Sequence, residues 1–332
     1  MQTMQTTQSA CVLVTGGSGL VGSALRRMCG PDLTYRFVFA SSRDCDLTDY
    51  DATLRYFRTV APHAVIHLAA AVGGLFKNMR HKVDMFETNV RINLNVLRVC
   101  HELGVSKVVS CLSTCIFPDE KTKSGPIDET MLHEGAPHAS NAAYAHAKRM
   151  LEVQSRCYRE QYGRNFVCVI PTNIYGPHDN FDLDDAHVIP ALIHKCYLAK
   201  RDGVPLVVAG SGAPLRQFIY SRDLAFMLIW VLQHYDYDAP SESGSGTLIL
   251  SVDPAHEISI AQVVQHITEA IGLDNDVVYD TSQADGQFRK TADNSKFKRL
   301  YGHDAPFAFT PIHQGIRETV QWFVQNYHNA RK

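Results

Sequence analysis

The sequence lacks several features that would assign it to common classes of protein. No apolar run approaches the ~18 residues of a membrane span, and residues 1–9 are polar and lack the apolar core of a signal peptide. The 32 basic and 34 acidic side chains leave a formal net charge of −2, without a basic tail or stripe. We therefore expect neither a membrane nor a nucleic acid as a partner, and we expect residues 1–9 to be disordered.

Paired cysteines are also missing. The nine cysteines contain no CxxC pair and follow no regular spacing, which is typical of free thiols in a reducing compartment. We expect a cytoplasmic protein without a metal site, and targeting to an organelle by an unusual signal stays open. With 45% hydrophobic and 20% charged residues, the composition is that of a globular protein.

What the sequence does contain is a glycine turn between a strand pattern and a helix pattern. The apolar run 11–15 leads into Gly16, Gly19 and Gly22, and a helical pattern follows over 23–29. Such glycines let the backbone approach a diphosphate, and the helix N-terminus favours its negative charge. Since the turn lies between a strand and a helix, it predicts dinucleotide binding, whereas the alternative is an ordinary glycine turn.

The next strand pattern, 35–40, indicates which dinucleotide is bound. It ends in Ser41, Ser42 and Arg43 rather than in the acidic residue that usually binds the ribose of NAD. An arginine there accommodates a 2′-phosphate, so we predict NADP. The alternative is a solvated arginine in a surface loop.

Strand and helix patterns alternate through residue 170, and the period then breaks at Pro171. This alternation predicts an α/β fold with a doubly wound parallel sheet. We expect a Rossmann domain that binds NADP, formed by residues 10–170 and about 217–235. Residues 171–216 and 236–330 would form a smaller α/β domain that binds the substrate.

Three residues suit the reduction of a carbonyl group. Ser113 follows the strand pattern 107–112, where open α/β sheets bind ligands. Tyr144 and Lys148 are four apart in a helical pattern and share one face. The ammonium would lower the pKa of the phenol, so that Tyr144 could donate a proton to a ketone oxygen held by Ser113.

Cys115 and His187 would add a second activity. We expect Cys115 to lie with Ser113 on one face of a strand, facing the carbons beside the ketone. A thiolate could remove a proton there while His187, which opens a later helix, donates one from the opposite face and inverts the centre. The alternatives are an inert packed cysteine and a surface histidine.

Together these motifs resemble the extended short-chain dehydrogenase/reductase family. The similar segments are 16–22, 67–74, Ser113–Pro118, 171–181, 187–193 and 210–218, and they cover roughly residues 10 to 328 of the chain. They are most similar to family members that bind a GDP-linked 4-keto-6-deoxy sugar. The resemblance implies Cys115 as base and His187 as acid at C3 and C5, with Ser113, Tyr144 and Lys148 serving NADPH-dependent reduction at C4.

The resemblance also extends the set of site residues. For the cofactor NADPH/NADP we expect Gly16, Ser18, Gly19, Leu20, Val21, Ser41, Ser42, Arg43, Asp46, Leu47, Leu68, Ala69, Ala70, Tyr144, Lys148, Pro171, Asn173, Ile174 and His187. For the GDP-sugar substrate it implies Asn173, Val188, Lys195, Arg216 and Lys290, with Arg216 at the diphosphate. It further implies a homodimer through two long helices, about 78–103 and 141–162.

Other functions on the same scaffold stay open. A nucleotide-sugar 4-epimerase or a simple ketoreductase would need no cysteine–histidine pair, and a 4,6-dehydratase would carry an Asp-Glu pair where this chain has Cys115-Ile116. A non-catalytic NADP sensor is ranked last among the alternatives. Such proteins commonly lose the tyrosine or the lysine, and this chain has both Tyr144 and Lys148.

Overall fold

A computed structural model describes residues 10–30, 35–120, 125–237, 246–283, 289–302 and 307–332. The predicted disordered segment 1–9 lies outside the described residues. Among the described residues, no helix has both the length and the apolarity needed to cross a membrane. All nine cysteines are free thiols.

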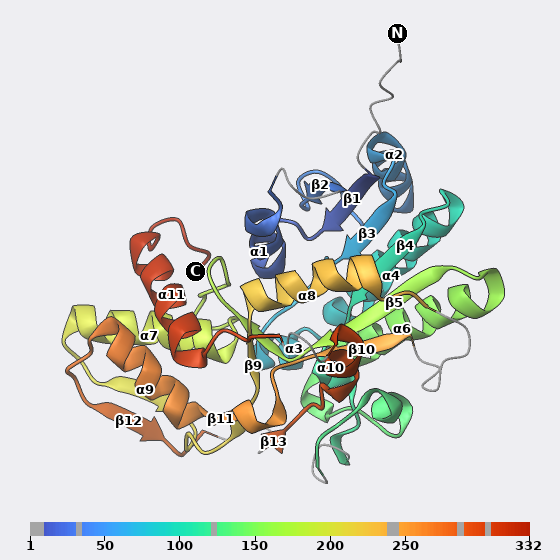
Figure 1. The fold of residues 1–332 in the computed structure, drawn as a ribbon. Coiled ribbons are helices and arrows are strands. Elements are labelled where there is room, and N and C mark those ends of the chain that lie inside the picture. Colours follow the sequence, from blue (N-terminus) through green and yellow to red (C-terminus); the bar gives the residue numbers. More distant parts are fainter. Residues whose placement is uncertain (1–9, 31–34, 121–124, 238–245, 284–288, 303–306) are drawn as a thin grey trace.

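The centre of the fold is a six-stranded parallel sheet with the strand order β10-β5-β4-β3-β1-β2 (Figure 1). The chain runs from β1 to the neighbouring β2 and then returns to the other side of β1 for β3, so the connection changes direction between β1 and β3. Parallel sheets bind ligands at such a switch point, outside the carboxyl ends of the strands. The strands are β1 (Ala10–Thr15), β2 (Tyr35–Ala40), β3 (Ala64–His67), β4 (Lys107–Cys111), β5 (Asn165–Pro171) and β10 (Thr247–Leu250).

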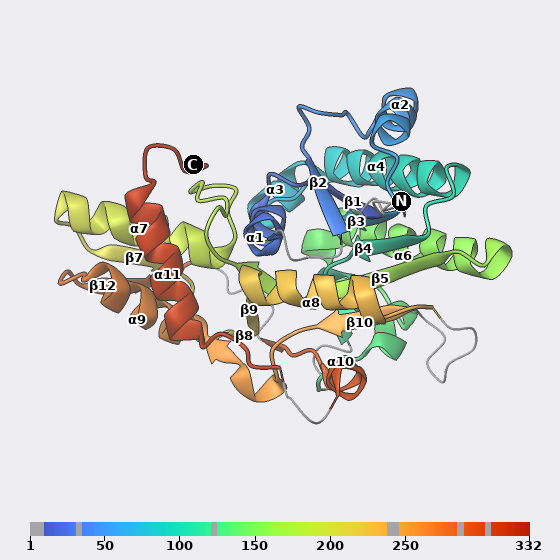
Figure 2. The same ribbon diagram turned by 45° about the horizontal axis from the view of Figure 1, so that its top comes forward.

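Helices cover both faces of the sheet, as Figure 2 shows for α8 on one face and for α4 and α6 on the other. Alternate strand residues face opposite sides, so Leu13 packs in one core and Val12 and Val14 in the other. One face carries α2 (Tyr50–Val60), α4 (Lys82–Glu102) and α6 (Ala142–Tyr162); the other carries α1 (Leu20–Met28), α8 (Ser221–His234) and α10 (Ser295–Tyr301).

A third hydrophobic core joins the later helices α7 (Val188–Asp202), α9 (Ile260–Ile271) and α11 (Ile312–Gln325). Three small sheets accompany it: β12 (Val277–Asp280) with β7 (Leu206–Ala209), β6 (Asn173–Tyr175) with β9 (Phe218–Tyr220), and β8 (Leu215–Arg216) between β11 (Ile258–Ser259) and β13 (Arg289–Lys290). The β6–β9 pair links this region to the end of β5. The predicted combination of a doubly wound sheet with a smaller α/β region is therefore confirmed.

Two expectations about the elements are wrong. The predicted smaller domain includes Thr247–Leu250, yet this segment is the sixth strand of the central sheet, and Phe297 of α10 packs into the sheet's core. The strand joins because its backbone groups pair with the free edge of β5. The helix expected over 78–103 is broken at His81, which separates α3 (Leu75–Arg80) from α4. The remaining domain boundaries stay a prediction.

Candidate active site

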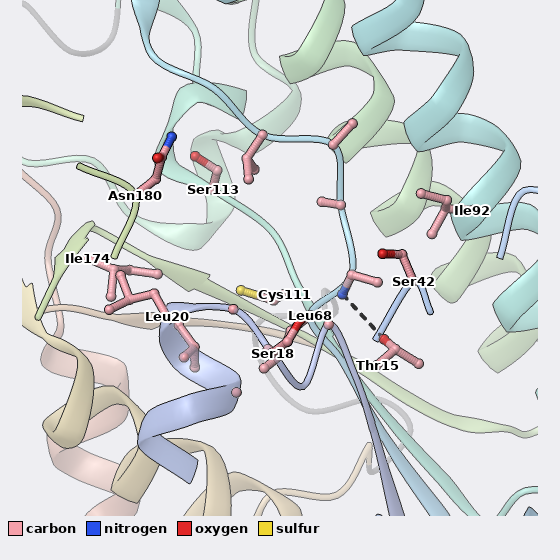
Figure 3. Close-up of a pocket in the computed structure, with 18 of the residues that line it drawn as sticks. Thr15, Ser18, Leu20, Ser42, Leu68, Ile92, Cys111, Ser113, Ile174 and Asn180 are labelled. Carbon is pink, nitrogen blue, oxygen red and sulfur yellow. Dashed lines mark hydrogen bonds between the residues drawn. The ribbon is translucent and has the colours of Figure 1, made fainter. Parts of the chain in front are cut away.

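A cavity of about 840 Å³ lies at the carboxyl ends of β1, β3 and β4, at the switch point of the sheet (Figure 3). Its walls come from the glycine turn after β1, from the segments after β2, β3 and β4, and from the loop that precedes α7. An extended dinucleotide needs a long cavity that meets several strand ends, and this one satisfies that requirement.

The glycine turn has the close backbone approach that a diphosphate site requires. Gly16 has φ +70°, and a Cβ there would lie 2.8 Å from the backbone nitrogen of Ala69, so only glycine is accommodated. The N-cap of α1, Gly19, has no side chain to bond the first amides of the helix. The first residues of the helix line the cavity, and helix N-terminal amides can bind phosphate oxygens, so the residues present suit the diphosphate of a dinucleotide.

Ser41 and Ser42 line the far end of the cavity, as predicted. The Asp44 carboxylate accepts hydrogen bonds from the Ser41 amide and hydroxyl at 2.8 and 2.7 Å. These bonds hold the pKa of Asp44 below its usual value. Arg43 is exposed and does not line the cavity. The two serines and the turn that Asp44 stabilises therefore form this end, while the role of Arg43 at a 2′-phosphate stays a prediction.

The structure brings together nearly all of the residues predicted for the cofactor. Every one except Arg43 lies on the cavity wall: Gly16, Ser18, Gly19, Leu20, Val21, Ser41, Ser42, Asp46, Leu47, Leu68, Ala69, Ala70, Tyr144, Lys148, Pro171, Asn173, Ile174 and His187. Their individual roles in binding stay predictions.

Ser113, Tyr144 and Lys148 line the same cavity. Tyr144 and Lys148 share one face of α6, and the Lys148 ammonium lies 5.9 Å from the centre of the Tyr144 ring. This ammonium donates a hydrogen bond of 2.8 Å to the carbonyl oxygen of Cys111 at the end of β4. The sheet thus fixes the position of the lysine beside the tyrosine.

The expected effect of Lys148 on the phenol is not found in the free protein. Burial raises the pKa of Tyr144 well above its usual value, and the nearby thiols of Cys115 and Cys111 raise it further. Burial likewise lowers the pKa of Lys148. The prediction of a lowered phenol pKa is therefore wrong for the free protein, because burial disfavours the charged form of Tyr144 and Lys148 is not among the groups that shift its pKa. Tyr144 is held as a neutral proton donor.

Ser113 and Cys115 do not lie on a strand, contrary to expectation. Strand β4 ends at Cys111, and residues Thr114–Ile116 form a short 3-10 helix capped by Ser113. The Ser113 hydroxyl accepts a hydrogen bond of 3.3 Å from the Cys115 amide, which turns the chain out of the sheet. The two side chains are close because of this turn and not because of strand alternation.

Burial raises the pKa of the Cys115 thiol, while Lys290, the Ser113 hydroxyl and Lys148 all lower it. The thiol therefore lies within electrostatic range of two ammonium groups that favour its ionised form. Cys115 does not itself line the cavity described above and packs partly against the core on the α6 side of the sheet.

His187 directly precedes α7 and lines the cavity. The residue is exposed at its surface, yet desolvation by the surrounding protein lowers the pKa of its imidazole. The loop before it is anchored on the segment after β3: the Gly74 amide donates to the Asp185 carbonyl oxygen at 2.8 Å, and Lys77 pairs with the Asp185 carboxylate at 2.9 Å. His187 is thus positioned by contacts on the cofactor side.

The residues predicted for the sugar nucleotide lie on separate elements beside the cavity. Lys290 of β13 is the register partner of Arg216 on the neighbouring β8, so two cations lie side by side. Asn173 lines the cavity, and its amide donates to the Gln217 carbonyl oxygen at 2.9 Å. Val188 and Lys195 are on α7. Except for Asn173, this set does not line the dinucleotide cavity, and its role stays a prediction.

Asp179, Asn180 and Arg331 line the cavity but were not predicted as site residues. The first two lie in the polar segment that follows β6, and their only sequence signal is the similarity of segment 171–181 to the family. No local sequence pattern indicates that Arg331 belongs to the site.

His67 is a buried histidine whose two ring nitrogens are both hydrogen-bonded. They bond to Thr15 at 2.8 Å and to Asn93 at 3.1 Å, and burial lowers the pKa of His67 to about 3.

Comparison with known proteins assigns the class. Residues 12–243 match the NAD dependent epimerase/dehydratase family. The chain belongs to this family, which confirms the resemblance seen in its motifs.

Its relatives include a GDP-L-fucose synthase from Dictyostelium discoideum, which is 53% identical over 330 residues that make up 99% of each chain. A probable GDP-L-fucose synthase from Drosophila melanogaster is 46% identical over 97% of this chain and 99% of its own. The solved structure of a GDP-L-fucose synthetase from Naegleria fowleri bound to NADP has a TM-score of 0.89 and 48% identity, and covers 98% of this chain and 96% of that chain.

Proposed function

We propose that this protein catalyses the NADPH-dependent conversion of GDP-4-keto-6-deoxy-D-mannose to GDP-L-fucose. The reaction comprises epimerisation at C3 and C5 followed by reduction of the C4 ketone. The observation that carries the proposal is the meeting of Ser113, Tyr144, Lys148 and His187 on one cavity whose other wall is the glycine turn. The GDP-L-fucose synthases among the relatives support the choice of sugar.

NADPH would lie across the switch point, with its diphosphate at Gly16 and Gly19 and its adenosine half towards Ser41 and Ser42. Bound there, it supplies the hydrogen and electron pair that reduce the ketone carbon. The Naegleria relative binds NADP, which supports the same choice here.

In the reduction, Tyr144 donates its phenolic proton to the C4 oxygen and Ser113 holds that oxygen by a hydrogen bond. The neutral phenol favoured by burial is the form that this role needs. As the phenolate forms, the Lys148 ammonium stabilises it, and solvent protons restore the phenol.

In the epimerisations, the C4 ketone acidifies the protons at C3 and C5. Cys115 removes one of them as a thiolate, and His187 returns a proton to the opposite face of the same carbon. Both pKa directions favour neutral side chains in the free protein. Ionisation of Cys115 therefore depends on the neighbouring positive charge of Lys290, and His187 must take up a proton from solvent before it can donate one to the carbon.

The experiment that tests this function incubates the purified protein with NADPH and GDP-4-keto-6-deoxy-D-mannose in deuterated water. Oxidation of NADPH with two deuterons on product carbon is the expected result. Oxidation without deuterium would indicate a plain ketoreductase, and absence of oxidation would point to another nucleotide sugar or to an NADP sensor.

The protein acts as a homodimer through α4 and α6, which pack against each other and expose apolar side chains. Phe86 and Leu94 on α4 and Met150 on α6 are 38%, 48% and 51% exposed. Leu94→Glu should yield monomers in sedimentation, while Val324→Glu on the exposed face of α11 should not. A Leu94→Glu protein that stays dimeric would exclude this interface.

The nine free thiols suit a reducing compartment, and the proposed location is the cytoplasm. Expression of the tagged protein followed by cell fractionation tests this.

A further inference from the structure

The dinucleotide cavity contains few positive charges. Among the described residues that line it, only Lys148 and Arg331 have permanently basic side chains. Lys148 is held beside Tyr144, where its ammonium donates a hydrogen bond to the Cys111 carbonyl oxygen. A diphosphate that carries two negative charges therefore meets the helix N-terminus and, among these cations, Arg331.

Arg331 is held at the cavity by its main chain and by its side chain. The Phe181 amide donates to the Arg331 carbonyl oxygen at 2.8 Å, and Asn180 and Arg331 form an isolated parallel bridge. The guanidinium Nη2 donates to the His178 carbonyl oxygen at 2.8 Å. A guanidinium has five N–H donors, so this bond fixes the group and leaves further donors for a ligand.

The turn that receives Arg331 is itself constrained. His178 has φ +69°, a left-handed conformation that costs energy in a residue with a side chain. Arg27, in the last turn of α1, lies 2.7 Å from the His178 ring nitrogen Nε2. The strained turn is thus bonded to the C-terminal end of α1, the helix whose first residues line the cavity, so the segment that holds Arg331 is fixed relative to this helix.

The position along the cavity separates Arg331 from the 2′-phosphate end. Figure 3 shows Asn180, the bridge partner of Arg331, with Ile174 on the side opposite Ser42. The cations predicted for the sugar nucleotide, Arg216 and Lys290, lie outside this cavity. Asn180 also lies beside Ser113, so of the phosphates of the dinucleotide the diphosphate is expected nearer to Arg331 than the 2′-phosphate.

The carboxyl group of Asp179, which also lines the cavity, is a second reason why the cavity needs a positive charge at Arg331. Asp179 is 5% exposed, and its Oδ2 is buried without a hydrogen-bond partner among the described residues. Burial raises the pKa of Asp179 to about 7, and the charge of Arg331 opposes this rise. Without Arg331, a carboxylate near the cofactor would repel phosphate, so the guanidinium offsets that charge too.

We propose that Arg331 binds the diphosphate of the nicotinamide dinucleotide. This proposal rests on the NADP-binding part of the proposed function. It predicts that the residue contributes to cofactor affinity in the absence of sugar, and that it contributes equally for NADPH and NADH, since both carry the same diphosphate.

The test measures the Kd of NADPH and of NADH by fluorescence titration, without sugar and at low ionic strength, for the wild type, Arg331→Met and Arg331→Lys. Loss of a charge-assisted bond predicts about a tenfold rise in Kd for Arg331→Met with both dinucleotides. Arg331→Lys keeps the positive charge but lacks the paired N–H donors of the guanidinium, so it should give an intermediate rise in Kd. Neither variant removes the main-chain bond to Phe181, and thermal unfolding checks that each is folded.

Lys332→Met is the matched control, because it removes a positive charge one residue away that does not line the cavity and that bonds the Tyr327 carbonyl oxygen instead. Its Kd values should equal those of the wild type. Unchanged Kd values in Arg331→Met would overturn the proposal, as would a rise for NADPH alone, which indicates the 2′-phosphate, or a rise confined to the KM of the sugar.

The two proposals fail in different ways. A wild type that binds NADPH but does not convert the sugar refutes the proposed reaction and leaves the role of Arg331 to be decided by the titrations. A wild type that binds neither dinucleotide refutes both.

Discussion

The two halves of the site are built in different ways. The cofactor half consists mainly of backbone and small side chains at the ends of adjacent strands, such as Gly16, Ser41 and Ala69. The half that we propose for the sugar depends on single long side chains, Arg216 and Lys290, from strands about 75 residues apart that meet in the small sheet of β8 and β13. One half is set by backbone geometry, and the other by individual charges.

This difference predicts how each half fails. Backbone geometry cannot be replaced by another side chain, so a substitution at the glycine turn should disturb binding and folding together. A charge can be removed without disturbing the fold, so substitutions in the sugar half should change chemistry and leave cofactor binding intact. The residues proposed for catalysis fall on both sides of this division, since Tyr144 lines the cofactor cavity whereas Cys115 does not and lies within electrostatic range of Lys290.

The largest effect is expected for Cys115→Ser. A serine hydroxyl is a far weaker base than a thiolate, so deuterium exchange at C3 and C5 should fall by roughly 10³-fold. The Kd of NADPH should stay unchanged, since Cys115 does not line the cofactor cavity. Mass analysis of the recovered sugar measures the exchange. Exchange at the wild-type rate would show that Cys115 is not the base.

Tyr144→Phe should separate the activities in the opposite way. Without the phenolic proton, reduction should slow by about 10²-fold, while exchange at C3 and C5 continues because it depends on Cys115 and His187. NADPH oxidation and deuterium incorporation are followed in one reaction. Loss of both activities together would mean that Tyr144 positions the substrate rather than donating a proton.

Gly16→Ala tests the cofactor half, and Gly104→Ala, outside the cavity, is its matched control. Both glycines have a left-handed φ, +70° and +68°, but a Cβ at Gly104 meets nothing within 4 Å. Gly104→Ala should cost about 1 kcal/mol of unfolding free energy. Gly16→Ala should cost about 3 kcal/mol or more and weaken NADPH binding, because Ala69 must move.

Urea unfolding and NADPH titration measure the two effects. Equal losses of stability in both variants, with the Kd of NADPH unchanged, would show that the close approach of Gly16 to Ala69 is unimportant.

Asp179→Asn tests whether the cofactor half contains a costly charge. The pKa of Asp179 in the fold, about 7, lies above its usual value of 3.8, so the folded state holds a proton that the unfolded state releases. Its contribution to stability is therefore full below pH 4 and disappears as the pH rises to about 7. The asparagine should flatten this decline and stabilise the protein by up to about 4 kcal/mol at pH 8.

Urea unfolding from pH 5 to 8 measures the slope, and Asp274→Asn, at an exposed site, is the control. If the free energy of unfolding of Asp179→Asn depended on pH as steeply as that of the wild type, the raised pKa of Asp179 would be contradicted.

The same division explains what the sequence could predict. The parallel sheet, the glycine turn and the polar residues after β2 and β4 are local signals, and the cavity contains them. The predicted strand extends too far past the end of β4. The Ser113 hydroxyl accepts a hydrogen bond from the Cys115 amide, and hydrophobic periodicity does not reveal such a bond between a side chain and the backbone. Strand β10 was missed because four residues carry little pattern and its place depends on the free edge of β5.

Contacts between distant segments were the least predictable part of the site. Arg331 reaches the cavity by bonding to a loop about 150 residues earlier in the chain. The pairing of Lys290 with Arg216 likewise depends on the small sheet of β8 and β13. For these positions only the resemblance to known proteins, or the structure, supplies the information.

Lys290 allows the sharpest test of a charge acting alone. Its positive charge favours the Cys115 thiolate, so Lys290→Met should raise the pKa of the thiol. The rate of Cys115 alkylation, measured by mass spectrometry without sugar, should then rise at correspondingly higher pH. Lys290→Arg keeps the charge and should keep the wild-type profile.

Because no diphosphate is present in this assay, loss of substrate binding cannot mimic the shift. An unchanged profile in Lys290→Met would mean that another group ionises Cys115. A shift without any change in the Kd of NADPH would show that the sugar half is tuned independently of the cofactor half.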